Sequence, residues 1–383
     1  MRARTQGSGV WRWGQRLAVF GLGLLLTACA SGPDKPQPTT LSPNAALIGV
    51  RLAWSNRIGP VNFPLDVGVN GSTVTVAGSD GSVAAIDTAT GADQWRASVG
   101  TDINAGVGSD GRYAALVTRG NDLVVLERGR EIWREKLGAL SFTAPFVAGE
   151  RVFAMTADRV ITAFDARSGR RLWSYSRQGD LPLALRQSSV MLAVGDTLVV
   201  GISGRLVGIN PLTGTLRWET PIATARGTND VERLVDLVGR VSRDGNVVCA
   251  RAFQTAIGCV DASRGNLLWS RPAVGADGIH GDAELVFGTE SDGKVIAWRR
   301  ANGEPAWTSE RLKYRGLTAP LAIGRSVAVG DATGLVHFLS RQDGSLLTRM
   351  STDGSPIVAA PVVAGNTLVV VTQNGGVFGF RPD

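Results

Sequence analysis

The segment Val83–Trp95, VAAIDTATGADQW, contains the pattern that decides the fold. A short apolar run ends at Asp87, a polar turn follows, and Trp95 stands four residues after Gly91. An aspartate at a strand end can bond its own backbone and start a turn, and glycine supplies the positive φ that such a turn needs. The segment therefore predicts two antiparallel strands joined by a tight turn.

The pattern repeats through the chain with a period near 40 residues. The spacings between successive turn glycines run from 38 to 51 residues, and these glycines are Gly91, Gly129, Gly169, Gly214, Gly265, Gly303 and Gly344. In every repeat but the last, where Thr348 stands, a tryptophan follows the glycine by four residues. Such a period, built from short strands, is the signature of four-stranded propeller blades. We expect the tryptophans to be core residues that pack against the neighbouring blade, since each buries a large apolar surface.

The number of strands predicts a closed ring. Residues 356–381 supply three strands of a blade without a fourth, and residues 50–55 supply a fourth strand with no blade before it. Pairing these two ends leaves no open sheet edge. The expected fold is all-β: an eight-bladed β-propeller of four-stranded antiparallel blades, with the ring closed by the N-terminal strand pairing with the C-terminal blade.

Residues 1–28 have the features of an export signal. Four arginines precede the apolar run 17–26, which is too short for a typical membrane-spanning helix. The next residues, Leu26-Thr27-Ala28-Cys29, resemble the bacterial lipobox. That resemblance implies cleavage before Cys29, which would carry the lipid, and Ala30-Ser31 in place of an aspartate implies the outer membrane. A plain secretory signal with an incidental cysteine is the alternative.

The segment after the signal predicts a flexible tether. Residues 29–46 are rich in Pro, Ser, Thr and Ala, so the propeller is expected over residues 47–383. The signal contains four arginines and no acid, so its removal lowers the net charge from +7 to +3. This modest charge, without a Lys/Arg cluster among aromatic residues, argues against nucleic acid as a partner.

Two cysteines are placed for a cross-strand pair. Cys249 and Cys259 flank the segment 250–258, and a turn centred near Gln254 would set the two thiols opposite each other on adjacent strands. The periplasm is oxidising, so we predict a disulfide there. Two reduced, packed thiols are the alternative.

The sequence gives no positive sign of catalysis. Its two histidines, His280 and His337, are isolated, and no His or Cys spacing suits a metal. No nucleophile elbow, P-loop or dinucleotide fingerprint occurs. We therefore expect a protein that is not an enzyme and holds neither a cofactor nor a metal.

Two connections between blades, residues 177–187 and 223–236, are longer than the rest and follow consecutive blades. They are expected side by side on one face, and long loops on a rigid scaffold are where binding concentrates. The first is unusually apolar for a loop and carries Arg186 beside its leucines, which favours a protein-contact surface. Alternatively, the leucines pack beneath the loop as a small satellite core.

The repeat Asp-x-x-x-Gly-x-x-x-Trp resembles the tryptophan-docking repeats of pyrroloquinoline-quinone dehydrogenases, which are also eight-bladed propellers. Members of that family bind the quinone with a pair of adjacent cysteines and a calcium site. This chain has three cysteines, none of them adjacent to another. A periplasmic pyrroloquinoline-quinone-dependent oxidoreductase is therefore kept only as the alternative function.

The lipobox together with the repeats resembles the BamB family of lipoproteins, which belong to the outer-membrane β-barrel assembly complex. The most specific match lies in the two long loops, DLPLALR at 180–186 and VERLVD at 231–236. The resemblance implies that four residues contact the POTRA domains of BamA: Leu183, Leu185, Arg186 and Asp236. The family's second loop aspartate is replaced here by Val238.

This second resemblance implies a non-enzymatic scaffold that is anchored to the outer membrane on its periplasmic face. Its partners would be BamA, through BamA the rest of the Bam complex, and nascent outer-membrane barrel proteins. It would assist the folding and insertion of β-barrel proteins. The first measurement it calls for is an affinity pull-down of the membrane-extracted protein.

Overall fold

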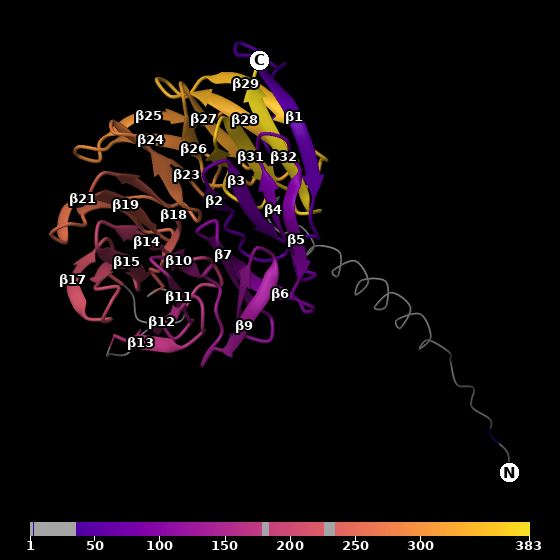
Figure 1. Ribbon diagram of the computed structural model, residues 1–383. Coiled ribbons are helices and arrows are strands. Elements are labelled where there is room, and N and C mark those ends of the chain that lie inside the picture. Colours follow the sequence, from indigo (N-terminus) through magenta and orange to yellow (C-terminus); the bar gives the residue numbers. More distant parts are fainter. Residues whose placement is uncertain (1–2, 4–35, 178–183, 226–233) are drawn as a thin grey trace. The chain divides into compact units, whose positions relative to one another are not determined.

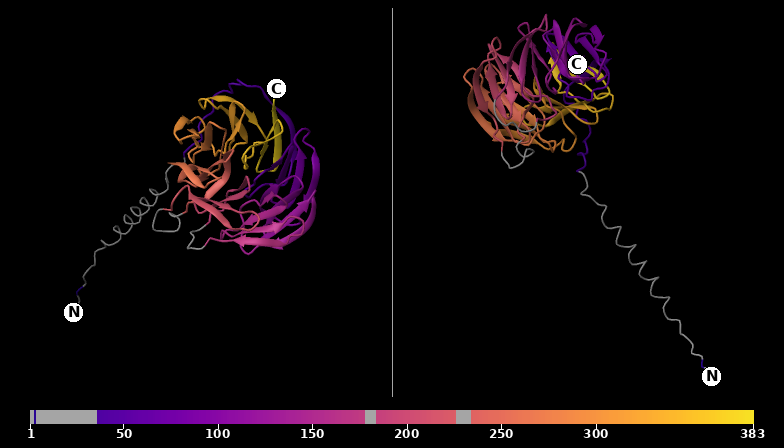
Figure 2. Two further views of the ribbon diagram at one scale, coloured as in Figure 1. Left: turned by 60° about the vertical axis from the view of Figure 1, so that its left-hand side comes forward. Right: turned by 90° about the horizontal axis from the view of Figure 1, so that it is seen from below.

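The computed structural model describes residue 3 and residues 36–177, 184–225 and 234–383. Cys29 and Leu183 lie outside the described residues. In the described part, all regular elements are β-strands, which form eight four-stranded antiparallel sheets. Figures 1 and 2 show these sheets arranged as blades around a common axis. No helix that could cross a membrane occurs in this part of the chain.

Seven of the blades take their four strands in chain order. Blade 1 consists of β2 (Gly68–Asn70), β3 (Thr73–Ala77), β4 (Ser82–Asp87) and β5 (Asp93–Ser98), and blade 2 of β6 (Ile103–Ser109), β7 (Tyr113–Thr118), β8 (Asp122–Glu127) and β9 (Arg130–Lys136). Blade 3 consists of β10 (Phe146–Ala148), β11 (Arg151–Met155), β12 (Ile161–Asp165) and β13 (Arg171–Tyr175), and blade 4 of β14 (Met191–Val194), β15 (Thr197–Ile202), β16 (Arg205–Ile209) and β17 (Leu216–Pro221). Blade 5 consists of β18 (Leu237–Asp244), β19 (Val247–Ala252), β20 (Ala256–Asp261) and β21 (Asn266–Pro272). Blade 6 consists of β22 (Ile279–Gly281), β23 (Leu285–Thr289), β24 (Val295–Arg299) and β25 (Pro305–Ser309). Blade 7 consists of β26 (Leu321–Ile323), β27 (Ser326–Gly330), β28 (Leu335–Ser340) and β29 (Leu346–Ser351).

Blade 8 joins the two ends of the chain. It consists of β30 (Val362–Ala364), β31 (Thr367–Val371), β32 (Gly376–Pro382) and, as its outer strand, β1 (Val50–Arg57). β1 pairs antiparallel with β32 from Val50 opposite Pro382 to Arg57 opposite Gly376. In Figure 1 the indigo β1 lies beside the yellow β32. The eight-bladed fold and its closure by the N-terminal strand are thus confirmed.

Each repeat tryptophan docks on the turn of the next blade. A Cβ on Gly91, whose φ is +76°, would lie 2.6 Å from the Trp54 ring, so only glycine fits there. The Trp54 indole N–H donates to the Thr88 carbonyl at 2.8 Å. The same glycine–ring contact recurs for Gly129 on Trp95, Gly169 on Trp133, Gly214 on Trp173, Gly265 on Trp218, Gly303 on Trp269 and Gly344 on Trp307. The packing against the neighbouring blade follows the sequence prediction.

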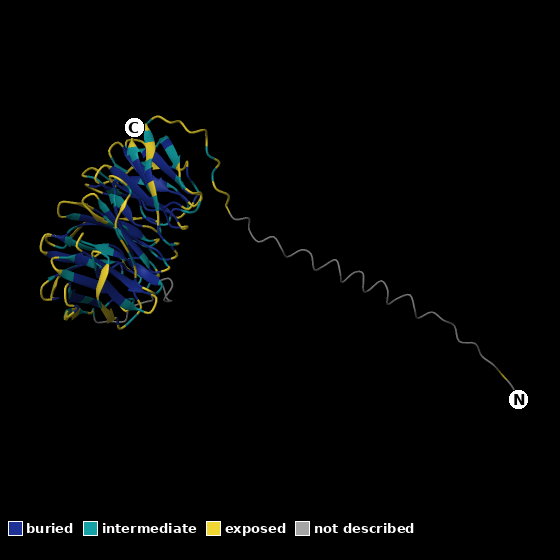
Figure 3. Ribbon diagram, turned by 45° about the vertical axis from the view of Figure 1, so that its right-hand side comes forward, coloured by how far each residue is buried: buried dark blue, intermediate teal, exposed yellow. Residues whose placement is uncertain are grey.

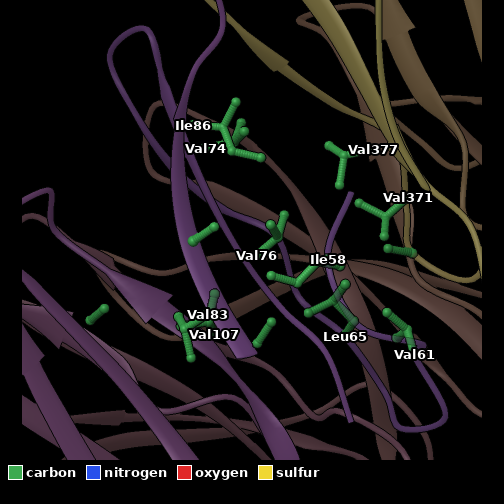
Figure 4. Packing of buried hydrophobic residues seen from close by; sticks show 14 of the residues in the cluster. Ile58, Val61, Leu65, Val74, Val76, Val83, Ile86, Val107, Val371 and Val377 are labelled. Carbon is green, nitrogen blue, oxygen red and sulfur yellow. The ribbon is translucent and has the colours of Figure 1, made fainter. Parts of the chain in front are cut away.

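Apolar side chains fill the space between blades. The middle strands are rich in Val and Ala, and their residues are largely buried, while the outer strands and turns carry most of the exposed residues (Figure 3). Figure 4 shows Val371 and Val377 of blade 8 in one cluster with Val74 and Ile86 of blade 1. The seam that closes the ring therefore has the same apolar packing as the rest of it.

A segment before the first strand also belongs to the compact unit that contains the propeller. This unit begins at Pro38. We call Thr39–Leu47 the strap, because it is held along blade 7 by hydrogen bonds. The Thr39 N–H donates to the Lys313 carbonyl at 3.0 Å, and the Leu47 N–H donates to the Leu347 carbonyl at 2.8 Å. An outer strand leaves backbone groups unpaired, and these can bind a passing segment of almost any composition.

Candidate partner-binding site

The connections between blades meet at one mouth of the axial channel, and we call this side the loop face. Residues from five of these connections and from the start of β18 line one cavity of about 290 Å³. The two long loops predicted to bind a partner belong to this face. The described parts of the first loop are residue 177 and residues 184–187, and those of the second are residues 223–225 and 234–236.

The structure brings the two loops together through one carboxylate. Asp236 Oδ2 accepts the backbone N–H of Leu185 at 2.9 Å, and Asp236 Oδ1 accepts Nη2 of Arg159 at 2.7 Å. Arg159 is buried and has a φ of +62°, in the turn between β11 and β12. A charge-assisted bond from a buried guanidinium is stronger than a neutral one. The position of the Leu185 backbone is therefore fixed relative to blade 3.

Beside this bond lies an exposed surface of apolar and basic side chains. The Arg186 side chain is exposed, and its guanidinium lies over the Phe142 ring with the centroid 5.7 Å away. Leu140 is 53% exposed, and its carbonyl accepts the Ala157 N–H in the turn that holds Arg159. We call Leu140, Phe142, Leu185 and Arg186 the docking surface. Aromatic residues and arginine are the types that dominate protein–protein contacts.

Asp236 occupies a different place from that expected of a partner contact. Both of its oxygens bind groups of this chain, and its side chain is only 13% exposed. Val238, at the position of the family's second aspartate, is buried. The geometry makes Asp236 the residue that holds the loop in place.

Sequence reasoning did not single out Arg159, Leu140 or Phe142. Leu140 and Phe142 lie in the connection before blade 3, where two large apolar residues in a loop were an available signal. Arg159 follows an aspartate in an ordinary-looking turn, and its partner lies 77 positions away. No local pattern reveals such a pair.

The two buried cysteines of blade 5 lie opposite each other, as the hairpin prediction requires. Cys249 pairs with Cys259 in the β19–β20 ladder, and Gln254 in the intervening turn has a φ of +47°. The structure joins the two sulfurs in a disulfide, with the Cα atoms 3.9 Å apart. This bond links two strands of one sheet and lies outside the docking surface.

Both histidines serve the packing of blades 6 and 7. His337 Nε2 lies 2.9 Å from the buried Asp331 carboxylate, and His280 Nδ1 accepts the Ala322 N–H at 3.1 Å. Burial, together with the charges of Arg240 and Arg300, lowers the pKa of His280 to about 4. In the described residues, no three His, Cys, Asp or Glu side chains are grouped so as to hold a metal ion.

Comparison with known proteins agrees with this architecture. The family model described as "Outer membrane protein assembly factor BamB" matches residues 79–309. A protein of that name from Burkholderia pseudomallei (strain K96243) is 39% identical over 376 residues, which cover 97% of this chain and 98% of that protein. The crystal structure of BamB from Moraxella catarrhalis has a TM-score of 0.78 at 26% identity, and the match covers 87% of this chain and 99% of that one.

A more distant likeness shows the fold alone. The quinohemoprotein alcohol dehydrogenase from Comamonas testosteroni has a TM-score of 0.68 at 16% identity, over 90% of this chain and 79% of that one. The match in sequence, by contrast, spans nearly the whole chain and includes both long loops. The chain belongs to the BamB family of outer membrane protein assembly factors.

Proposed function

We propose that the protein is a non-enzymatic scaffold lipoprotein that binds the POTRA domains of BamA through the docking surface. The observation that carries the proposal is the fixed Leu185–Arg186 backbone, which the Asp236–Arg159 pair holds beside exposed Leu140 and half-buried Phe142. A loop fixed before binding loses little entropy when a partner arrives. Binding BamA would bring the scaffold to the site where β-barrel proteins fold and insert.

The chemistry of the docking surface suits a partner with an apolar pocket and an acidic or carbonyl rim. Leu140 and Leu185 offer apolar area for such a pocket. The Arg186 guanidinium lies over the Phe142 ring, which leaves its N–H edge available for a carboxylate or a backbone carbonyl. Charge-assisted bonds of this kind would fix the orientation of the partner.

Attachment to the outer membrane is the second part of the proposal. A lipid on Cys29 would connect to the ring at Thr39, the first residue of the strap. Ten residues span at most about 35 Å when fully extended. The strap would therefore keep blades 6 and 7 within that distance of the anchor, on the periplasmic face of the membrane.

Pull-down of the membrane-extracted protein tests the contact. Arg186→Ala and Leu185→Ser should each weaken recovery of a POTRA-containing partner at least about tenfold, because they remove a central contact. Leu216→Asp is the matched control: Leu216 is 49% exposed but lies on β17, away from the docking surface. Thermal unfolding of all three variants should stay within about 2 °C of the parent. Loss of stability together with binding would mean that these residues are core.

Asp236 needs a separate readout because it acts through the loop. Asp236→Asn weakens the bond to Arg159 and should raise the hydrogen-exchange rate of the Leu185 amide along with the loss of partner binding. If binding falls while the Leu185 amide stays protected, Asp236 contacts the partner directly and the positioning role is refuted.

The alternative, a pyrroloquinoline-quinone-dependent oxidoreductase, has only the shared propeller fold in its favour. The three cysteines include no adjacent pair, and the described residues offer no acidic cluster for calcium. These residues do not fit the quinone site expected from that resemblance. Dye reduction that depends on added quinone and Ca²⁺ would overturn the scaffold proposal.

A further inference from the structure

The axial channel contains two cavities that share a charged wall. The cavity at the loop face has a volume of about 290 Å³. The second, about 280 Å³, is lined by the first strands of blades 1 to 5. Three residues border both cavities: Asp66, Gly239 and Arg240. They separate the two spaces and expose charged groups to each.

The charged side chains of this wall lack ion-pair partners. The Arg240 guanidinium makes one hydrogen bond, from Nη1 to the Pro361 carbonyl at 2.6 Å, and forms no ion pair with a described residue. Asp66 Oδ2 accepts the Ser188 hydroxyl at 2.5 Å. Asp277 borders the loop-face cavity, and its carboxylate has no hydrogen bond or ion pair among the described residues. The Arg240 guanidinium and the Asp277 carboxylate thus keep hydrogen-bonding groups that no described residue occupies, although the charges of Asp66 and Arg251, respectively, act on them.

Two buried arginines of the same ring have ion-pair partners, whereas buried Arg300 bonds to the Ser242 hydroxyl and the Asp282 carbonyl and forms no ion pair with a described residue. The fully buried Arg251 lies 3.0 Å from Glu290, and Arg315 lies 2.8 Å from Asp331. Pairing is the general rule, because an enclosed charge without a partner destabilises the fold. Arg240 therefore departs from what this protein does at two other places in blades 5 to 7.

Burial disfavours the charged forms of the side chains in this wall. Burial lowers the pKa of the Arg240 guanidinium, and burial also raises the pKa of the Asp66 carboxyl. Asp277 is reached by water through the cavity, yet the enclosing chain raises the pKa of its carboxyl as well. A ligand with complementary charge would replace the missing solvation.

The positions of Arg240 and Asp277 define what the ligand must be. Their backbones touch, since a Cβ on Gly278 would collide with the Arg240 backbone and one on Gly239 would collide with Gly278. A guanidinium and a carboxylate from these adjoining segments therefore line the same cavity, without an ion pair between them. A simple anion would be repelled by the carboxylates, and a metal ion lacks a third protein ligand among the described residues. A molecule that carries both charges avoids both difficulties.

We propose that the loop-face cavity binds a small zwitterion of amino-acid to dipeptide size, with its acidic group on Arg240 and its ammonium on Asp277. The planar guanidinium suits a carboxylate or phosphate in two-pronged fashion, and the Asp277 carboxylate accepts from the ammonium. The volume of about 290 Å³ accommodates such a molecule and excludes a folded partner. The site is distinct from the docking surface and does not depend on partner binding.

Calorimetry on the full-length, membrane-extracted protein tests the proposal with probes of matched size. Glycine, β-alanine and glycylglycine carry both charges, while N-acetylglycine lacks the ammonium and glycinamide lacks the carboxylate. At least one zwitterion should bind in a saturable manner, and both single-charge analogues should bind at least about tenfold more weakly. No saturable heat with any zwitterion up to about 20 mM, or equal affinity for the single-charge analogues, would overturn the site.

Variants separate binding from folding. Arg240→Gln and Asp277→Asn should each weaken the best zwitterion at least about tenfold, whereas Arg57→Gln, an exposed arginine at the end of β1, should not. Arg240→Met should raise the melting temperature of the ligand-free protein, because it removes an enclosed charge that lacks an ion pair. A lower melting temperature for Arg240→Met would assign Arg240 to the fold and contradict the proposal.

Discussion

At the residue scale, the enclosed polar side chains fall into two groups. Asp331 binds Arg315, His337 and the turn at Thr333, and its pKa is held far below the usual range despite burial. Among the described residues, His280 has only the Ala322 N–H as a hydrogen-bond partner, and it stays neutral. The first kind of group fixes a turn, while the second makes the fold sensitive to acid.

His280 gives the clearest pH prediction. Its pKa is about 4 in the folded protein and about 6.5 when unfolded, so the unfolded chain takes up a proton first as the pH falls. Stability is fully present above pH 6.5 and falls by up to about 3 kcal/mol by pH 4. His280→Asn should remove this loss, which urea unfolding of both proteins between pH 7 and 4 would measure. Parallel curves for the two proteins would exclude His280 as the source.

At the element scale, the unit of the fold is a tryptophan on one blade and a turn glycine on the next. The glycine is required twice over, by its positive φ and by the ring that lies against it. The eighth position has Thr348 because blade 8 has no such turn: the chain ends lie there instead. The Asn44 side chain of the strap reaches Thr348 Oγ1 at 3.5 Å.

Substitutions at two glycines distinguish the requirement for a positive φ from the requirement for close contact with the ring. A Cβ on Gly303 (φ +72°) would lie only 2.4 Å from the Trp269 ring, whereas a Cβ on Gly324 (φ +54°) would have no atom within 4 Å. Gly324→Ala should cost about 1 kcal/mol from the backbone alone, and Gly303→Ala should cost about 2–4 kcal/mol because the ring must also move. Urea unfolding measures both. Equal costs would mean that the ring contact contributes nothing.

The blades could be predicted from the sequence because their signals are local. Asp87, Gly91 and Trp95 lie within nine residues, and each repeat shows the same physics of turn and ring. The strap could not be predicted, since its backbone groups bind blade 7 and its composition resembles a free linker. The Asp236–Arg159 pair and the charged channel wall join residues far apart in sequence, so only the folded ring reveals them.

At the scale of the whole molecule, one strand decides whether the ring is closed. β1 supplies the outer strand of blade 8 and also the ring of Trp54 that lies on Gly91 of blade 1. The strap makes fewer bonds and covers the connection between blades 6 and 7 and the outside of blade 7. Closure therefore depends on β1 far more than on the strap.

Two truncated proteins test this dependence. A chain starting at residue 49 keeps β1 and should unfold in one cooperative transition near the parent's melting temperature. A chain starting at residue 58 loses β1, exposes the edge of β32 and should melt at least about 10 °C lower or aggregate. Thermal unfolding with size-exclusion chromatography distinguishes the two. Similar melting and elution of both chains would show that the ring is stable without β1.

The pairing of Val50 with Pro382 also determines when the ring can close during synthesis. β1 pairs with residues that are made about 330 positions later. Blades 1 to 7 can assemble in order, but the ring stays open, with an unsatisfied edge at each end, until β32 has been made. A chain that stops early is thus distinguishable from a finished one by its open edges, and proteases and chaperones that recognise such edges can act on it before it reaches the barrel-assembly machinery.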